Sequence, residues 1–142
     1  MDLLAHVDDA FLTANVSGEK GGMVLVDDAD IAQLVAKTGG HIAVQTGGSA
    51  ANAILGATQL GLRTSFLGKI GTDSTGDRYF RDFVAAGCDG SRFKRATLPN
   101  GRCFSLVTPD GQRTLRTHLG AAMTLAPAEI SAEDLRVARH AH

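Results

Sequence analysis

A pair of glycines followed by small polar residues is the part of the sequence best suited to binding a ligand. Residues 46–52 read Thr-Gly-Gly-Ser-Ala-Ala-Asn and follow an alternating segment, residues 41–45, that predicts a short strand. Ser49 is the predicted N-cap of a helix over 50–60, with Asn52 one turn inside it. Free backbone N–H groups at such a helix start suit a polar or anionic ligand. The same turn is also common as a purely structural connection in α/β proteins.

The spacing of glycines continues beyond this turn. Gly61 follows the predicted helix, a second strand is expected over 64–69, and residues 71–76 (Gly-Thr-Asp-Ser-Thr-Gly) precede another helix. Asp73 is placed to cap that helix, which is predicted over 74–86, and Gly87 to end it. We interpret its apolar stripe as structural packing. Strand, glycine turn and helix therefore occur twice in succession.

This order of motifs resembles the N-terminal signature of the ribokinase-like (PfkB-type) kinases of sugars and nucleosides. In that signature a Gly-Gly pair is followed by an Asn four residues after the second Gly, and then by two further glycines. The matching positions are Gly47, Gly48, Asn52, Gly61 and Gly71. Residues 85–88 (Ala-Ala-Gly-Cys) also resemble a family segment, whereas Ile54 stands where the strict signature prefers a small residue.

The resemblance implies an α/β fold, the ribokinase-like αβα sandwich, with a small β-strand lid over the substrate site. Alternating strands and helices predict a largely parallel sheet. Pro109-Asp110-Gly111 indicates a hairpin within 102–118 that departs from this rhythm. We therefore expect residues 1–142 to be the N-terminal part of a kinase domain, with lid strands near 3–7, 23–26 and 102–118. Further predictions are helices over 8–14, 29–37 (capped by Asp28) and 128–139, and an extended segment over 92–98.

Five residues are candidates for the acceptor side of a phosphoryl transfer. By resemblance, Asp2 accepts hydrogen bonds from two sugar hydroxyls, Gly47 and Gly48 let the sugar lie against bare backbone, and Asn52 satisfies another hydroxyl. Arg113 is a weaker candidate for contact with the transferred phosphate. The family's Gly-Ala-Gly-Asp motif, which supplies the anion hole and the catalytic base, has no counterpart here. We expect ATP and Mg²⁺ to serve the full-length enzyme and this chain alone to be inactive.

Composition excludes several other classes of function. The chain has 142 residues and a net charge of −1 with both signs interspersed, so it shows no nucleic-acid footprint. Arg92, Lys94, Arg95 and Arg102 are interpreted as a solvated strand face. No apolar run approaches membrane-spanning length, and the two cysteines and five histidines lack metal-ligand spacing. We expect a cytoplasmic location.

The identity of the acceptor and the role of the chain remain open at this level. Residues 7–12 and 22–27 resemble the adenosine-kinase branch most, so a ribonucleoside such as adenosine is the leading acceptor and a ribose- or fructose-type sugar follows. Two alternatives are a non-catalytic module that binds a small molecule and a fragment stabilised by self-association. Unpaired strand edges predict a homodimer or larger species.

Overall fold

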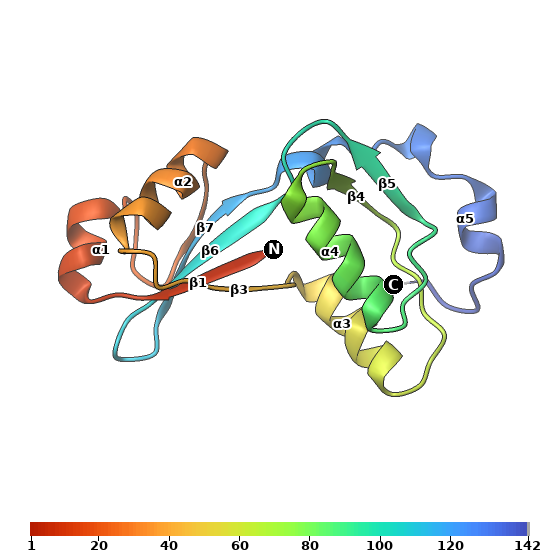
Figure 1. The fold of residues 1–142 in the computed structure, drawn as a ribbon, viewed down its shortest axis with the longest axis horizontal. Helices are drawn as coiled ribbons and strands as arrows, with labels where there is room; N and C mark the ends of the chain where they lie inside the picture. The colour runs from red at the N-terminus through yellow and green to blue at the C-terminus, as the bar shows by residue number, and fades with distance from the viewer. Residues whose placement is uncertain (142) are drawn as a thin grey trace.

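The computed structural model describes residues 1–141 and has two lobes joined through a few short segments (Figure 1). One lobe is a five-stranded sheet in the order β2-β7-β6-β1-β3, and the other contains a two-stranded sheet of β4 and β5. The strands are β1 (Asp2–His6), β2 (Met23–Leu25), β3 (Ala43–Gln45), β4 (Gly68–Gly71), β5 (Phe93–Ala96), β6 (Arg102–Val107) and β7 (Arg113–His118). The helices are α1 (Asp9–Asn15), α2 (Asp28–Lys37), α3 (Ser49–Gln59), α4 (Ser74–Ala85) and α5 (Ala132–Arg136), with 3₁₀ turns η1 (Gly120–Thr124) and η2 (Pro127–Glu129).

The five-stranded sheet is mixed, which corrects the prediction of a largely parallel sheet. β1 runs parallel to β6 and β2 parallel to β7, whereas β6–β7 and β1–β3 are antiparallel. The predicted hairpin is confirmed as β6 and β7, and its turn contains Gly111 at φ +82°. The predicted strands near 3–7 and 23–26 are confirmed as β1 and β2 of the same sheet. β3, the strand that precedes the glycine pair, also belongs to this sheet and forms one of its two edges.

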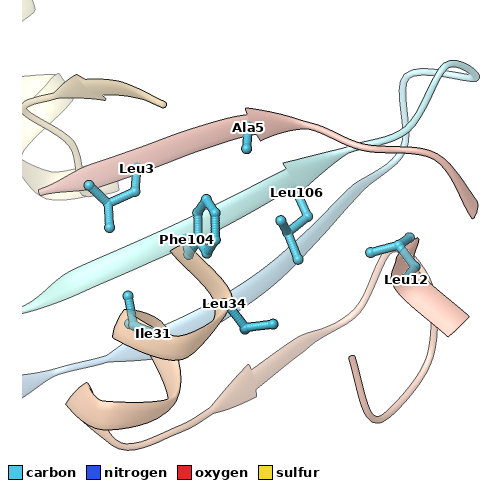
Figure 2. Packing of buried hydrophobic residues seen from close by; sticks show 7 residues of the cluster. All are labelled: Leu3, Ala5, Leu12, Ile31, Leu34, Phe104 and Leu106. Atoms are coloured by element: carbon cyan, nitrogen blue, oxygen red, sulfur yellow. The ribbon is translucent and has the colours of Figure 1, made fainter. Parts of the chain in front are cut away.

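Apolar side chains on one face of this sheet form its core with α1 and α2. Successive residues of a strand point to opposite faces, so Leu3 of β1 and Phe104 of β6 share the face that the helices cover. Figure 2 shows these side chains pointing toward Ile31 and Leu34 of α2. α2 presents this pair to the sheet because residues three apart lie on one side of a helix. The opposite face of the sheet is not covered by these helices.

Two predicted helix caps are wrong by one residue. α3 begins at Ser49, but its N-cap is Gly48, which adopts φ +106°. A side chain is disfavoured at that angle, so glycine accounts for the sharp entry into the helix. The N-cap of α2 is Asp27 rather than Asp28, and the Asp30 side chain accepts a hydrogen bond from the Asp27 N–H at 3.1 Å. The predicted cap of α4 is confirmed, since Asp73 accepts a hydrogen bond from the Gly76 N–H.

The second lobe packs α4 against the parallel pair of β4 and β5. Phe83 of α4 is fully buried, with Phe66 and Phe93 rings at 5.2 and 5.3 Å between centroids. The strand predicted over 64–69 lies slightly later, as β4, and the extended segment over 92–98 is confirmed as β5. The helix predicted over 128–139 is shorter than expected, because the chain forms η2 and then α5 there.

The basic residues interpreted as a solvated strand face are instead paired with carboxylates. Arg92 and Lys94 both contact Asp134 of α5 at 3.4 Å. Arg95 pairs with Asp77 at 2.8 Å, and Arg102 pairs with Asp28. Sequence alone missed these pairs because each joins segments that are distant along the chain. Within residues 1–141, no helix is both long and apolar enough to cross a bilayer.

Candidate functional site

A cavity of about 320 Å³ lies where the two lobes meet. Asp2 and Cys103 border it from the five-stranded sheet, and Gly47 and Gly48 border it from the turn between β3 and α3. Tyr79 of α4 and the segment leading into β4 border it from the second lobe. The cavity therefore combines one carboxylate, bare backbone and aromatic surface, which is a typical mixture for a small-molecule site.

The Asp2 carboxylate lies directly against the backbone of Gly47. Asp2 is paired with Gln45 of β3 and with Cys103 of β6, so strand pairing on both sides fixes its position. A Cβ atom added at Gly47 would overlap all three atoms of the Asp2 carboxyl group. Only glycine therefore allows this arrangement. An acidic side chain beside a residue that has no side chain of its own can accept hydrogen bonds from neighbouring hydroxyl groups of a ligand.

Tyr79 holds the glycine turn from the other side. Its hydroxyl donates a hydrogen bond to the Gly47 carbonyl oxygen at 3.2 Å. Burial, assisted by the nearby charge of Asp2, raises the pKa of the Tyr79 hydroxyl to about 12. Tyr79 is therefore protonated at neutral pH and remains a donor. This bond connects α4 to the turn that faces Asp2.

Cys103 and Thr117 form a neighbouring wall of the cavity from β6 and β7. The two residues are paired across the strands, and the Thr117 hydroxyl donates to the Cys103 sulfur at 3.2 Å. Burial raises the pKa of the Cys103 thiol, so the thiol is neutral and offers a polarisable, weakly polar surface.

The apolar surface continues along the uncovered face of the five-stranded sheet. Strand register places Leu4, Leu115, Met23 and Leu25 on the same face as Asp2. Met23 and Leu25 are each 58% exposed. Ser105 lies on this face too, and among residues 1–141 its buried hydroxyl has no hydrogen-bond partner.

The predicted site residues are only partly brought together. Asp2, Gly47 and Gly48 all border the cavity. Asn52 is exposed on α3 and does not border it, although its N–H donates to the Gly48 carbonyl at 2.9 Å. Arg113 is exposed at the start of β7, four residues before Thr117, and does not border it either.

A second cavity of about 370 Å³ lies beside the first, near the end of β2 and η1. The two cavities share residues 117–119 of the chain. The wall of the second includes Leu25, Leu98 and Met123, with Asp28 and His118 as its ionisable members. Asp28 is already paired with Arg102, so the first cavity offers the better arrangement for recognising hydroxyl groups.

Sequence reasoning did not identify Tyr79, Cys103, Thr117 or Asn100 as neighbours of the site. Tyr79 belongs to a helical stripe that packing alone explains, and its partner Gly47 is distant in sequence. For Cys103 a usable signal existed, because it alternates with the apolar core residues Phe104 and Leu106 of its strand. Thr117 had no such signal, because the buried residues of its strand are the polar Thr114 and Arg116.

Comparison with known proteins agrees with this architecture. Residues 18–141 match the family described as pfkB family carbohydrate kinase. A ribokinase from Staphylococcus aureus (strain COL) is 33% identical over 123 residues, which are 86% of this chain and 36% of that protein. Adenosine kinase 2 from Arabidopsis thaliana is 30% identical over 128 residues, with the same two coverages. The crystal structure of adenosine kinase from Sinorhizobium meliloti superposes with a TM-score of 0.81 at 32% identity, over 93% of this chain and 40% of that one.

The chain belongs to the PfkB family of carbohydrate kinases, because the family match spans most of its length. The ribokinase-like α/β fold predicted from the glycine motifs is confirmed by the superposition. The chain spans little more than a third of the curated relatives that it matches.

Proposed function

We propose that this chain supplies the acceptor-binding side of a PfkB-type kinase that phosphorylates a hydroxymethyl group of a ribonucleoside, with adenosine the leading acceptor. The observation that carries the proposal is the Asp2 carboxylate held over the bare backbone of Gly47 at the edge of a cavity. A carboxylate with two free oxygens can accept hydrogen bonds from two adjacent hydroxyls of a ribose ring.

The apolar part of the site favours a nucleoside over a free sugar. A nucleobase attached to the ribose would extend from Asp2 toward Cys103 and the uncovered face that carries Leu115 and Leu25. Burial of a flat aromatic ring against these side chains contributes hydrophobic free energy that a free pentose lacks. The likeness to two adenosine kinases supports the same choice.

A free pentose is the second candidate acceptor, because the ribokinase from Staphylococcus aureus is 33% identical to this chain. Both candidates use the same hydroxyl-binding carboxylate. They differ in whether the apolar face contributes to affinity. Comparing adenosine with ribose on the same protein therefore separates them.

The chemical step needs groups that we place outside this chain. Phosphoryl transfer in this family requires a catalytic base and donors that stabilise the developing charge. ATP with Mg²⁺ would supply the phosphoryl group. Within residues 1–141 no cluster of three His, Cys, Asp or Glu side chains has the arrangement of a metal site. We assign Mg²⁺ no step on the residues of this chain. Arg113, on the uncovered face, remains a proposed phosphate contact.

Calorimetry with adenosine and with ribose tests the proposal. We expect adenosine to bind, ribose to bind more weakly, and Asp2→Asn to weaken adenosine binding at least tenfold because one acceptor oxygen becomes a donor. Glu19→Gln removes the same charge at an exposed position and serves as the control. Equal adenosine affinity of Asp2→Asn and the unmodified chain would contradict the proposal.

A further inference from the structure

We propose that Asp73 and Asn100 are positioning residues that set the separation of the two lobes and, with it, the approach of Asp2 to Gly47. This inference rests on the proposed function, since that approach matters only if the cavity binds the acceptor. Within residues 1–141, no hydrogen bond joins either residue to the Asp2 carboxylate. Both act through the backbone segments that carry the site.

The Asp73 carboxylate joins two elements. Its Oδ1 atom accepts a hydrogen bond from the Gly76 N–H at 2.8 Å and so caps α4. Its Oδ2 atom accepts a second from the Asn100 N–H at 3.0 Å. A helix cap needs only the first of these bonds. The second fixes the start of α4 to the segment that leads into β6.

Asn100 extends this connection into β4. It is 4% exposed, and its Oδ1 atom accepts a hydrogen bond from the Gly71 N–H at 3.1 Å. Its Nδ2 group donates to the Gly101 carbonyl at 3.1 Å. The buried amide therefore has partners on both sides, and its removal would leave the Gly71 N–H without its acceptor.

Two backbone segments, residues 99–101 and 118–120, cross closely beside Asn100. A Cβ atom at Gly101 would lie 2.7 Å from the Leu119 carbonyl oxygen, and one at Gly120 would overlap the Pro99 carbonyl. The chain returns to the five-stranded sheet through the first of these segments, which leads into β6, and leaves it through the second, which follows β7. With no side chains between them, a shift of one segment displaces the other.

Both sides of the cavity depend on this crossing. On the sheet side, the Cys103 N–H donates to the Met1 carbonyl at 2.9 Å, and Cys103 is paired with Asp2. On the helical side, α4 holds the Gly47 carbonyl through Tyr79 at 3.2 Å. Asp73 is hydrogen-bonded both to the start of α4, which leads to Tyr79, and to the Asn100 backbone, which leads into β6. Loss of its second bond uncouples the two sides while leaving the cap in place.

Serine can cap a helix with its single oxygen but cannot make both bonds, so Asp73→Ser is the informative variant. Asp8→Ser is the matched control, because Asp8 caps α1 through the Phe11 N–H at 2.7 Å, away from the cavity. We would measure amide hydrogen exchange at Gly71 and Cys103, and adenosine affinity by calorimetry, well below the melting temperature of each variant.

We expect Asp73→Ser to accelerate exchange at Cys103 and to weaken adenosine binding, each at least tenfold, and Asp8→Ser to change neither. Asn100→Ala keeps the backbone bond to Asp73 but removes the Gly71 bond, and it should accelerate exchange at Gly71 and Cys103 in the same way. The inference would be overturned if the Cys103 amide exchanged in both variants at the rate of the unmodified chain. It would also be overturned if exchange were accelerated while adenosine affinity stayed equal to that of the unmodified chain. If the unmodified chain binds no adenosine, the proposed function fails, and exchange at Cys103 still decides the positioning role.

Discussion

At Gly47 the missing side chain determines where the Asp2 carboxylate lies. The residue is buried, its carbonyl is held by Tyr79, and its α-carbon leaves the space that the carboxylate occupies. The backbone at Gly47 does not require glycine for its φ angle, in contrast to Gly48 at φ +106°. The requirement at position 47 is therefore one of space, and a methyl group tests it.

Gly47→Ala should reduce adenosine affinity at least tenfold, or about 1.4 kcal/mol, because the new methyl group displaces the Asp2 carboxylate. Calorimetry measures the affinity, and circular dichroism verifies the fold. Gly56→Ala is the control, since nothing lies within 4 Å of its added Cβ. In the interior of α3 this change should stabilise the chain by about 0.5–1 kcal/mol. Equal affinities of the two variants would refute the spatial role of Gly47.

Titration of the Tyr79 hydroxyl reports on the buried side of the candidate site. It is the only tyrosine in a chain without tryptophan, so phenolate absorbance belongs to it alone. Its pKa is raised from 10.0 to about 12, which means that the folded state binds this proton more tightly than the unfolded state does. The resulting stability is present below pH 10.0 and is lost as the pH rises toward about 12. Ionisation near pH 10 in the folded chain would contradict the burial of this hydroxyl.

At the residue scale, the sequence predicted several neighbours of the cavity. Gly47, Gly48 and Asp2 were predicted from the resemblance, and all three border the cavity. Asn52 was predicted from the same motif, but its position on the exposed side of α3 depends on how the helix is rotated. Local spacing does not determine that rotation. It depends on which apolar face the second lobe buries.

At the element scale, ion pairs join η2 and α5 to the two-stranded sheet. Lys69 and Lys94 lie opposite each other on β4 and β5, a repulsive arrangement by itself. Glu129 contacts Lys69 at 2.7 Å, and Asp134 contacts Lys94 at 3.4 Å. Carboxylates from η2 and α5 therefore neutralise a pair of like charges on adjacent strands.

Asp134→Asn should lower the melting temperature at neutral pH and have little effect near pH 2. Hydrogen bonds from Ser131, assisted by Lys94, lower the pKa of the Asp134 carboxyl from 3.8 to about 2. A lowered pKa gives stability that is fully present above pH 3.8 and is lost as the pH falls toward about 2. Thermal melts of both proteins across this range measure the effect, with Glu133→Gln as the exposed control. A difference in melting temperature that does not change with pH would argue against the ionised Asp134 carboxylate as the source of this stability.

Elements with local signals could be predicted, and those fixed by distant contacts could not. The β6–β7 hairpin follows from its Asp-Gly turn, and α4 follows from its Asp73 cap and apolar stripe. The antiparallel pairing of β3 with β1 has no local signal, because about forty residues separate the two strands. The late start of the C-terminal helix has a local cause that our prediction missed, since Ser131 caps α5 by accepting a hydrogen bond from the Asp134 N–H at 3.2 Å.

At the scale of the whole molecule, the uncovered sheet face and the open strand edges predict self-association. Met23 and Leu25 on that face are largely exposed, as are Leu60 and Leu62 at the end of α3. Light scattering should therefore detect dimers or larger species whose proportion rises with concentration. Met23→Lys combined with Leu25→Lys should shift the population toward monomer. If the chain is monomeric at every accessible concentration, the prediction of a homodimer is wrong.

We propose that the cavity between the lobes receives a nucleoside through Asp2, the glycine turn and the apolar sheet face. The most direct test of this proposal is an amide chemical-shift titration of the unmodified chain with adenosine. The largest shifts should fall on Gly47, Gly48, Cys103 and Thr117, with little change on α1 and α2 behind the sheet. Saturable shifts centred on α1 and α2, or no shifts at millimolar adenosine, would contradict it.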